Sequence, residues 1–247
     1  MKLNIFATSN VGCVRENNED MILVSRQFVR DGSFSDEVGI DAGDRWLVAL
    51  ADGMGGHSGG EVASSDVLHN LDYFYGDMPT GLGVADFNEA ILEWLNSINN
   101  IIDSKGHSSP DYHNMGTTLV ALAYYGGEFY WMNCGDSQVY RLHDGVLCQL
   151  STDHSLNNLM GSSEHTNLIT NCIGGGCKTS YIDMVNCTKM VQSGDVYMLC
   201  SDGLTDMVED EQIERLLKEG ADADALCQAA IDAGGNDNVS VCVIKIV

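Results

Sequence analysis

The stretch Trp46-Leu47-Val48-Ala49-Leu50-Ala51-Asp52-Gly53-Met54-Gly55-Gly56-His57 joins a run of apolar residues to an aspartate and a series of glycines. The apolar run predicts a buried strand. Asp52 follows directly at its end, where a rigid element fixes the carboxylate, and Gly53 leaves a backbone carbonyl free for a ligand. The stretch therefore predicts a sheet that presents oxygen atoms at its edge.

Carboxylates recur in similar places along the chain. They are Glu19-Asp20 before the run 21–24, Asp136 in a tight turn between two strands, Asp202 after the run 196–200, and Asp237-Asn238 before the last strand. A single Asp-Gly pair is usually an ordinary turn. Five positions placed alike instead favour an oxygen-rich site for Mg²⁺ or Mn²⁺, where two close cations bind a water and lower its pKa.

Two periodicities predict the remaining elements. Apolar and β-branched runs bounded by turn residues predict strands at 21–29, 46–51, 117–125, 128–133, 138–142, 146–150, 196–200 and 239–247. Apolar steps of three and four predict helices at about 60–75, 85–104, 209–218 and 222–233. Gly126-Gly127 and Asp144-Gly145 are hairpin signals, so the strands from 117 to 150 are predicted to form one antiparallel meander.

The order of these elements favours an α+β fold over a doubly wound parallel sheet, because strands and helices come in blocks without strict alternation. Residues 30–44 and 157–166 are expected to be loops. Neither resembles a linker between domains. We therefore expect residues 1–247 to form a single domain.

Composition excludes several classes of function. The 247 residues are 44% hydrophobic and carry a net charge of −24, which disfavours binding to nucleic acid or to an anionic membrane. No apolar stretch is long enough for a membrane span, and no signal peptide is recognisable. The nine cysteines are scattered without a CxxC pair, so we expect a cytoplasmic protein with reduced, mostly buried thiols.

The order of the motifs resembles the metal-dependent PPM family, the protein phosphatase 2C-like Ser/Thr phosphatases, in its bacterial form. The resemblance covers nearly the whole chain. It is carried by residues 12–20, 52–64, 116–118, 135–137, 152–155, 199–206 and 235–238.

That resemblance implies a four-layer αββα sandwich, with two central antiparallel sheets flanked by helices. It also implies two Mn²⁺ or Mg²⁺ ions that hold the water which hydrolyses phosphoserine or phosphothreonine directly, without a phosphoenzyme. By this resemblance Asp52 bridges both ions, Glu19 and the Gly53 carbonyl complete one site, and Asp202 and Asp237 complete the other. Asp136 with Asp202 forms a third, weaker site. Arg15 binds the phosphate, and Asp20 and Asn238 support these groups. The implied partners are phosphorylated proteins and a counteracting Ser/Thr kinase, with the phosphatase a monomer.

Three positions depart from the family's pattern. Met54 occupies the place of a histidine proposed as general acid in eukaryotic relatives, and Gln138 replaces a usual arginine. His57 is available as a proton donor, although a structural role fits it equally well. The segment between residues 154 and 168 is shorter than the usual flap beside the active site, which predicts altered substrate docking.

One other class of function stays as the alternative, and a second is excluded. A catalytically inactive binding module with the phosphatase fold should have lost metal-binding aspartates, but this chain keeps all of them. A calcium-binding protein of the EF-hand type would need alternating acidic ligands within twelve residues, and no such run exists.

Overall fold

Strand β5 (Arg45–Ala51) shows how alternate residues build two cores at once. Val48 and Leu50 pack between two sheets, whereas Leu47 and Ala49 face the helices on the other side. Successive side chains of a strand point to opposite faces, so a strand covered on both sides is apolar throughout. The run that predicted a buried strand therefore lies at the centre of the molecule.

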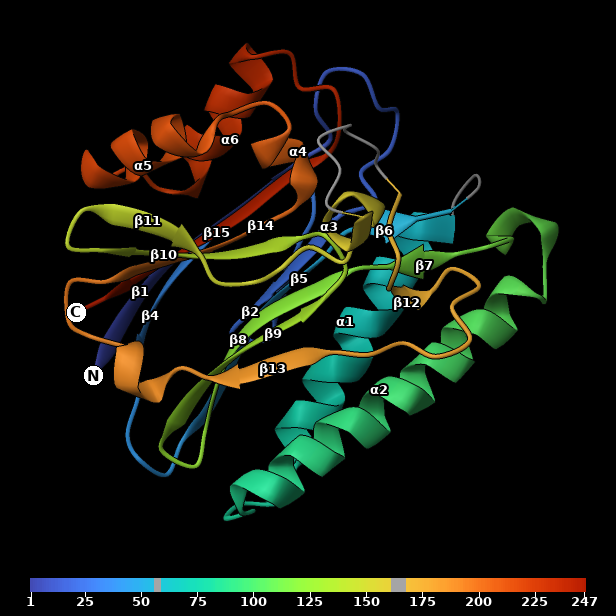
Figure 1. The fold of residues 1–247 in the computed structure, drawn as a ribbon, viewed down its shortest axis with the longest axis horizontal. Coiled ribbons are helices and arrows are strands. Elements are labelled where there is room, and N and C mark those ends of the chain that lie inside the picture. Colours follow the sequence, from blue (N-terminus) through green and yellow to red (C-terminus); the bar gives the residue numbers. More distant parts are fainter. Residues whose placement is uncertain (56–58, 161–167) are drawn as a thin grey trace.

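The structure is a computed structural model that describes residues 1–55, 59–160 and 168–247. Two six-stranded antiparallel sheets face each other (Figure 1). The first, called the β1 sheet, has the order β11 (Val146–Gln149), β10 (Gln138–His143), β14 (Val196–Cys200), β15 (Val239–Ile246), β1 (Lys2–Asn10) and β4 (Gly32–Gly39). The second, called the β5 sheet, has the order β13 (Asp183–Asn186), β9 (Glu128–Cys134), β8 (Leu119–Tyr125), β5, β2 (Met21–Val24) and β3 (Gln27–Val29).

Helices cover the outer face of each sheet (Figure 1). The β5 sheet packs against α1 (Gly59–Asp77) and α2 (Val84–Gly106), and the β1 sheet packs against α4 (Asp202–Thr205), α5 (Asp210–Lys218) and α6 (Ala223–Asp232). Three apolar cores separate these layers, one between the sheets and one under each helical layer. The predicted α+β fold and the αββα sandwich are confirmed.

A small third sheet lies beside the ends of β5 and β8. Its order is β12 (Ile173–Gly174), β7 (Gly116–Thr117) and β6 (Gly53–Met54). The remaining short elements are α3 (Leu156–Met160) and the 3₁₀ helices η1 (Pro110–Tyr112) and η2 (Thr188–Met190). Among the described residues, no helix combines the length and the apolar character needed to cross a membrane.

The predicted meander from 117 to 150 was wrong. β8 pairs with β9 and β10 pairs with β11, but β9 and β10 belong to different sheets. The turn through Asp136 therefore passes from one sheet to the other. This crossing places Asp136 between the two sheets.

Two expected loops also contain regular structure. Residues 30–44 include β4, an edge strand whose side chains are alternately more and less exposed. Residues 157–166 begin within α3, and the part from 161 onward lies outside the described residues, as does most of the short segment compared with a flap. β1, β12 and β13 were not predicted, and 21–29 is two strands joined by a turn at Ser25 and Arg26.

Candidate functional site

The acidic positions identified in the sequence meet at one edge of the sandwich, because each lies where a strand begins or ends. Asp52 follows β5 and Glu19-Asp20 precedes β2, both in the β5 sheet. Asp202 follows β14 and Asp237 precedes β15, both in the β1 sheet. Asp136 lies in the turn that joins the two sheets.

Asp52 is held by its backbone. Thr118 N–H and Thr117 Oγ1 both donate to the Asp52 carbonyl, at 2.9 and 2.8 Å, and Asp52 N–H donates to Thr118 Oγ1 at 3.0 Å. A Cβ on Gly53 would lie 2.1 Å from the Gly60 carbonyl oxygen, so the following position accepts only glycine. These contacts fix the Asp52 backbone and do not involve its carboxylate.

Asn238 ties the start of β15 to the loop that carries Arg15 and Glu19. Its Nδ2 donates to the carbonyls of Val11 and Asn17, at 2.9 and 3.0 Å, and its Oδ1 accepts from Glu19 N–H at 2.9 Å. All the side-chain groups of Asn238 are thus engaged with backbone. Asn238 therefore positions neighbouring groups.

Asp20 is fully buried and contacts a residue at the end of β14 in the β1 sheet. Its Oδ2 accepts a hydrogen bond of 2.8 Å from Ser201 Oγ, and its Oδ1 has no hydrogen-bond partner among the described residues. Burial raises the pKa of Asp20 to about 6, although the Ser201 hydrogen bond lowers it. A buried carboxylate oxygen without a donor fits a place close to a cation or an ordered water.

Arg15 bonds directly to one of the predicted metal ligands. Its Nη2 lies 2.6 Å from Asp237 Oδ2, and this hydrogen bond is the main cause that raises the pKa of Arg15. Glu19 and Asp52 also lie close enough for their charges to raise it. The guanidinium therefore reaches the carboxylates from the solvent side of the opening.

The carboxylates repel one another. Burial, followed by the charges of Asp20 and Asp202, raises the pKa of Asp52 well above its usual range. Burial, followed by the charge of Asp136, likewise raises the pKa of Asp202 well above its usual range. Burial raises the pKa of Asp136 to about 6, and it raises that of Glu19 to about 7 against the opposing charge of Arg15. A nearby positive charge would favour the ionised form of each of these groups and lower its pKa.

The donors fit a hard divalent cation. They are carboxylates and a backbone carbonyl, which Mg²⁺ and Mn²⁺ prefer. Within residues 1–55, 59–160 and 168–247, however, no three acidic, histidine or cysteine side chains form a group already arranged to hold an ion. Binding would therefore draw the carboxylates together, and Asp237 would share its charge between the cation and Arg15.

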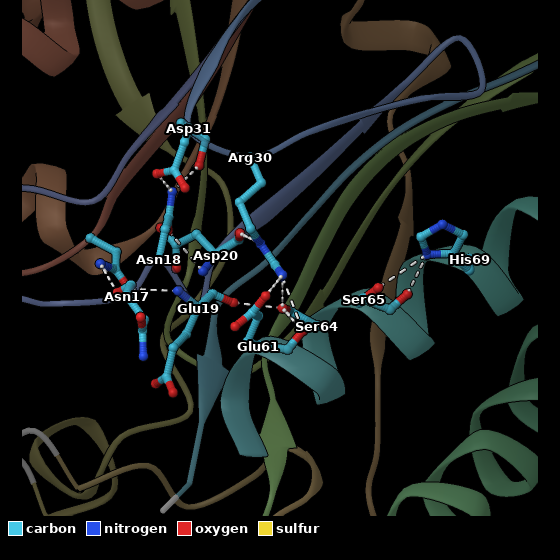
Figure 2. Close-up of polar contacts among 12 residues, drawn as sticks. Asn17, Asn18, Glu19, Asp20, Arg30, Asp31, Glu61, Ser64, Ser65 and His69 are labelled. Carbon is cyan, nitrogen blue, oxygen red and sulfur yellow. Dashed lines mark hydrogen bonds and ion pairs between the residues drawn. The ribbon is translucent and has the colours of Figure 1, made fainter. Parts of the chain in front are cut away.

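Arg30, which the sequence did not identify as a site residue, connects the segment before β2 with the first turns of α1 (Figure 2). Its Nε donates to the Asp20 carbonyl at 2.8 Å, and its Nη2 donates to Ser64 Oγ at 2.7 Å and to the Glu61 carbonyl at 3.1 Å. Ser64 Oγ in turn donates to the Glu19 carbonyl at 2.5 Å. Figure 2 shows the Glu19 side chain pointing away from this network, so the network grips the backbone and leaves the carboxylate available. A single arginine after a short strand gave no signal in the sequence.

The turn that carries Asp136 is held by His154. Gly135 N–H donates to His154 Nδ1 at 3.1 Å, and His154 N–H donates to the Gly135 carbonyl at 2.9 Å. Asn171 Nδ2 also donates to Nδ1, at 2.8 Å, so the ring proton sits on Nε2, which faces Asp183 at 3.1 Å. The imidazole is thus fixed in one tautomer beneath the turn.

A cavity of about 410 Å³ opens beside Asp136 and Asp202. Gln138, at the position of the family's usual arginine, donates to Asp153 at 2.8 Å on its wall. The acidic residues that line it are Asp136, Asp153, Asp202, Asp206, Glu209, Asp210 and Glu211. The cavity therefore has a strongly negative wall next to the predicted metal ligands.

The structure describes Met54, at the position of the histidine proposed as general acid in eukaryotic relatives, but not His57. Met54 is partly buried in β6, next to the Asp52 loop. His57 lies outside the described residues.

The chain is similar to known protein phosphatases. Residues 27–233 match the family described as Protein phosphatase 2C. The chain is 34% identical over 255 residues to the serine/threonine protein phosphatase PstP of Mycobacterium tuberculosis. The matched region covers 99% of this chain but only 45% of PstP. The chain therefore spans about half the length of this curated relative.

Solved structures share the fold. A serine/threonine phosphatase of S. agalactiae superposes with a TM-score of 0.81 at 26% identity, over 99% of this chain and all of the other. The catalytic domain of PstP in complex with two manganese ions has a TM-score of 0.76 at 33% identity, and the match covers both chains completely.

Proposed function

The chain belongs to the protein phosphatase 2C family, and we propose that it is a metal-dependent phosphatase that removes phosphate from phosphoserine and phosphothreonine in proteins. The observation that carries this proposal is the meeting of carboxylates from both sheets at one edge, where burial and then their mutual charge raise the pKa of Asp52 and Asp202. Such an arrangement costs stability unless cations neutralise it. The catalytic unit proposed is residues 1–247.

Asp52 would bridge two Mn²⁺ or Mg²⁺ ions. Glu19 and the Gly53 carbonyl would complete one site, and Asp202 with Asp237 the other. A weaker third site would use Asp136 and Asp202. The bound ions would supply Lewis acidity that activates water and offsets phosphate charge. The PstP catalytic domain with two manganese ions supports this number for the main site.

The chain's own residues would bind and orient the substrate. Arg15 is exposed at the mouth of the site, and its planar guanidinium suits two phosphate oxygens. Asp20 and Asn238 would hold the loop and the ligands in place through the contacts described above. His57 stays a candidate proton donor to the leaving hydroxyl.

We propose the partners and the cellular location on the basis of the family resemblance and the charge. Phosphorylated proteins would be the substrates, and a Ser/Thr kinase would supply them. A monomer in the cytoplasm is proposed, with no role for nucleic acid or membrane in view of the net charge of −24.

The direct test is hydrolysis of a phosphothreonine peptide by the purified chain with Mn²⁺ and with a chelator. Turnover that requires Mn²⁺ and is lost in both Asp52→Asn and Asp237→Asn would support the proposal. Absence of turnover by the folded chain at every Mn²⁺ concentration would overturn it and favour the inactive binding module. Thermal unfolding of each variant checks that the loss comes from the site.

A further inference from the structure

Cys172 and Cys177 lie side by side beneath the small sheet. Their Sγ atoms are 3.4 Å apart, and both are free thiols. Among the described residues, which include all nine cysteines, this is the one pair whose sulfur atoms touch. A disulfide has a sulfur–sulfur distance of about 2.05 Å, so the two atoms need to approach by little more than 1 Å.

The backbone between them is already folded into a closed turn. Cys177 N–H donates to the Gly174 carbonyl at 2.9 Å, and Gly174 N–H donates to Asn99 Oδ1 at 2.7 Å. Asn99 Nδ2 donates to the Cys177 carbonyl at 3.1 Å, so one buried side chain of α2 holds both ends of the turn. Gly176, next to Cys177, has a φ of +79°, and a Cβ on it would meet no atom within 4 Å, so the turn is open on the side of Gly176.

The two thiols have different surroundings. Cys172 is 4% exposed and its Sγ donates to the Gly174 carbonyl at 3.5 Å. Cys177 is only half-buried and is therefore the thiol that a small oxidant reaches first. Burial raises the pKa of Cys172, which keeps that thiol protonated and unreactive until a partner sulfur is activated beside it.

We propose that Cys172 and Cys177 are a peroxide-sensitive pair that closes into a reversible disulfide. Cys177 attacks hydrogen peroxide, which breaks the O–O bond and gives Cys177 sulfenic acid and water. Cys172 then attacks the sulfenic sulfur, and its proton leaves with the hydroxyl as a second water. In total two thiols are oxidised and one peroxide is reduced to two waters.

This pairing protects the small sheet. β12 pairs with β7, whose Thr117 supports the Asp52 carbonyl, so a lasting charge on a sulfur at this turn would disturb the Asp52 loop. A disulfide ends the oxidation at a step that thiols reverse, whereas an isolated sulfenic acid proceeds to irreversible sulfinic acid. Cys177 is the less buried of the two thiols, so we expect the closing motion on its side of the turn and an intact pairing of β12 with β7.

The test is peroxide treatment of the complete chain, followed by alkylation and peptide mass analysis without reductant. The expected product is a peptide with a Cys172–Cys177 disulfide, whose mass is lower by two hydrogens. Dithiothreitol should return it to the form with two free thiols. In Cys172→Ala, Cys177 is expected to accumulate sulfinic acid instead. In Cys177→Ser, which is the milder change because this residue is partly exposed, Cys172 should stay reduced.

Cys148→Ser is the matched control, since Cys148 is exposed and its thiol contacts the Gln149 carbonyl rather than another sulfur. The disulfide should form in it as in the unmodified chain. Sulfinic acid at Cys177 with Cys172 still reduced in the unmodified chain would overturn the proposal. So would a disulfide between another pair, or a Cys177 thiol that survives peroxide while Cys148 is oxidised. None of these readouts depends on phosphatase activity.

Discussion

Arg15 Nη2 is hydrogen-bonded at 2.6 Å to Asp237 Oδ2, although the two residues are 222 positions apart in the chain. A group expected to bind phosphate is thus bonded to a group expected to bind metal. A cation bound to Asp237 would draw charge from the carboxylate that accepts this hydrogen bond. Cation binding should therefore weaken the hold of Asp237 on the arginine.

Replacement of Arg15 separates these two roles. In Arg15→Gln, Mn²⁺ affinity is expected to stay the same or rise, because Asp237 loses a competitor. The KM for a phosphothreonine peptide should rise about tenfold, since a charge-assisted hydrogen bond at an exposed site contributes at the low end of its range. Calorimetric titration with Mn²⁺ and steady-state kinetics measure the two effects. Arg26→Gln, at an exposed arginine paired at 3.5 Å with Asp72, is the control. An unchanged KM in Arg15→Gln would contradict the phosphate-binding role.

The metal-free protein should lose stability as pH rises. Burial raises the pKa of Glu19 from 4.5 to about 7 in the folded state, so the folded chain binds more protons than the unfolded chain between these values. Stability falls with pH wherever the folded state holds more protons. Asp136, with a pKa raised to about 6, acts in the same direction.

The measurement is the melting temperature of the chelated chain from pH 4.5 to 7.5, where we expect a decrease of several degrees across that window. Saturating Mn²⁺ should remove much of this decrease, because the cation favours the ionised carboxylates. A melting temperature of the chelated chain that rises steadily with pH would contradict the raised pKa values of Glu19 and Asp136.

Arg30 should matter for metal affinity without contacting metal. Its contacts with the Asp20 carbonyl and Ser64 Oγ hold the backbone from which Glu19 and Asp20 project. Groups that orient metal ligands typically change affinity by about 10- to 100-fold. Arg30→Met is expected to weaken Mn²⁺ binding by about tenfold, and Arg30→Lys by less, as measured by calorimetric titration.

The stability of both Arg30 variants provides the control. A general loss of fold would lower the melting temperature of the chelated protein and blur the binding curve. A specific positioning role predicts weaker Mn²⁺ binding in a variant that still unfolds cooperatively. Equal Mn²⁺ affinities in Arg30→Met and the unmodified chain would show that the Glu19-Asp20 backbone holds without this guanidinium.

The acidic cavity predicts a preference for basic phosphopeptides. Glu209 and Glu211 are exposed on its wall, so their charges act through solvent and should be screened by salt. In Glu209→Gln combined with Glu211→Gln, kcat/KM for an arginine-flanked phosphothreonine peptide should fall severalfold at low salt and little at high salt. Glu89→Gln combined with Glu93→Gln, on the exposed side of α2, is the matched control. Equal turnover of basic and acidic phosphopeptides at low salt would contradict this prediction.

The sequence located the acidic positions because each adjoins a strongly apolar strand. Asp52 and Asp202 follow strands whose residues are nearly all buried, and such runs are the clearest signal in a chain. The family resemblance then supplied their roles. The backbone contacts that support them, such as those of Thr117 with Asp52, required the fold.

The errors have a physical cause. β9 is buried on two faces and β10 is buried on two faces in its first half, so the residue types do not tell which sheet each strand joins. β4 is an edge strand whose exposed positions carry serine and acidic residues, and this composition resembles a loop. Arg30 acts through backbone carbonyls of residues distant in sequence, and a pattern of side-chain types contains no record of such contacts.

The position of β15 has a consequence for the biosynthesis of the protein. This strand fills the gap between β1 and β14, and the residues just before it carry Asp237 and Asn238. A nascent chain can pair β5 with β8 and form the hairpins early, but the β1 sheet stays divided until residue 246 has left the ribosome. The proposed phosphatase activity should therefore appear in one late step, and no shorter nascent chain should act on phosphoproteins nearby.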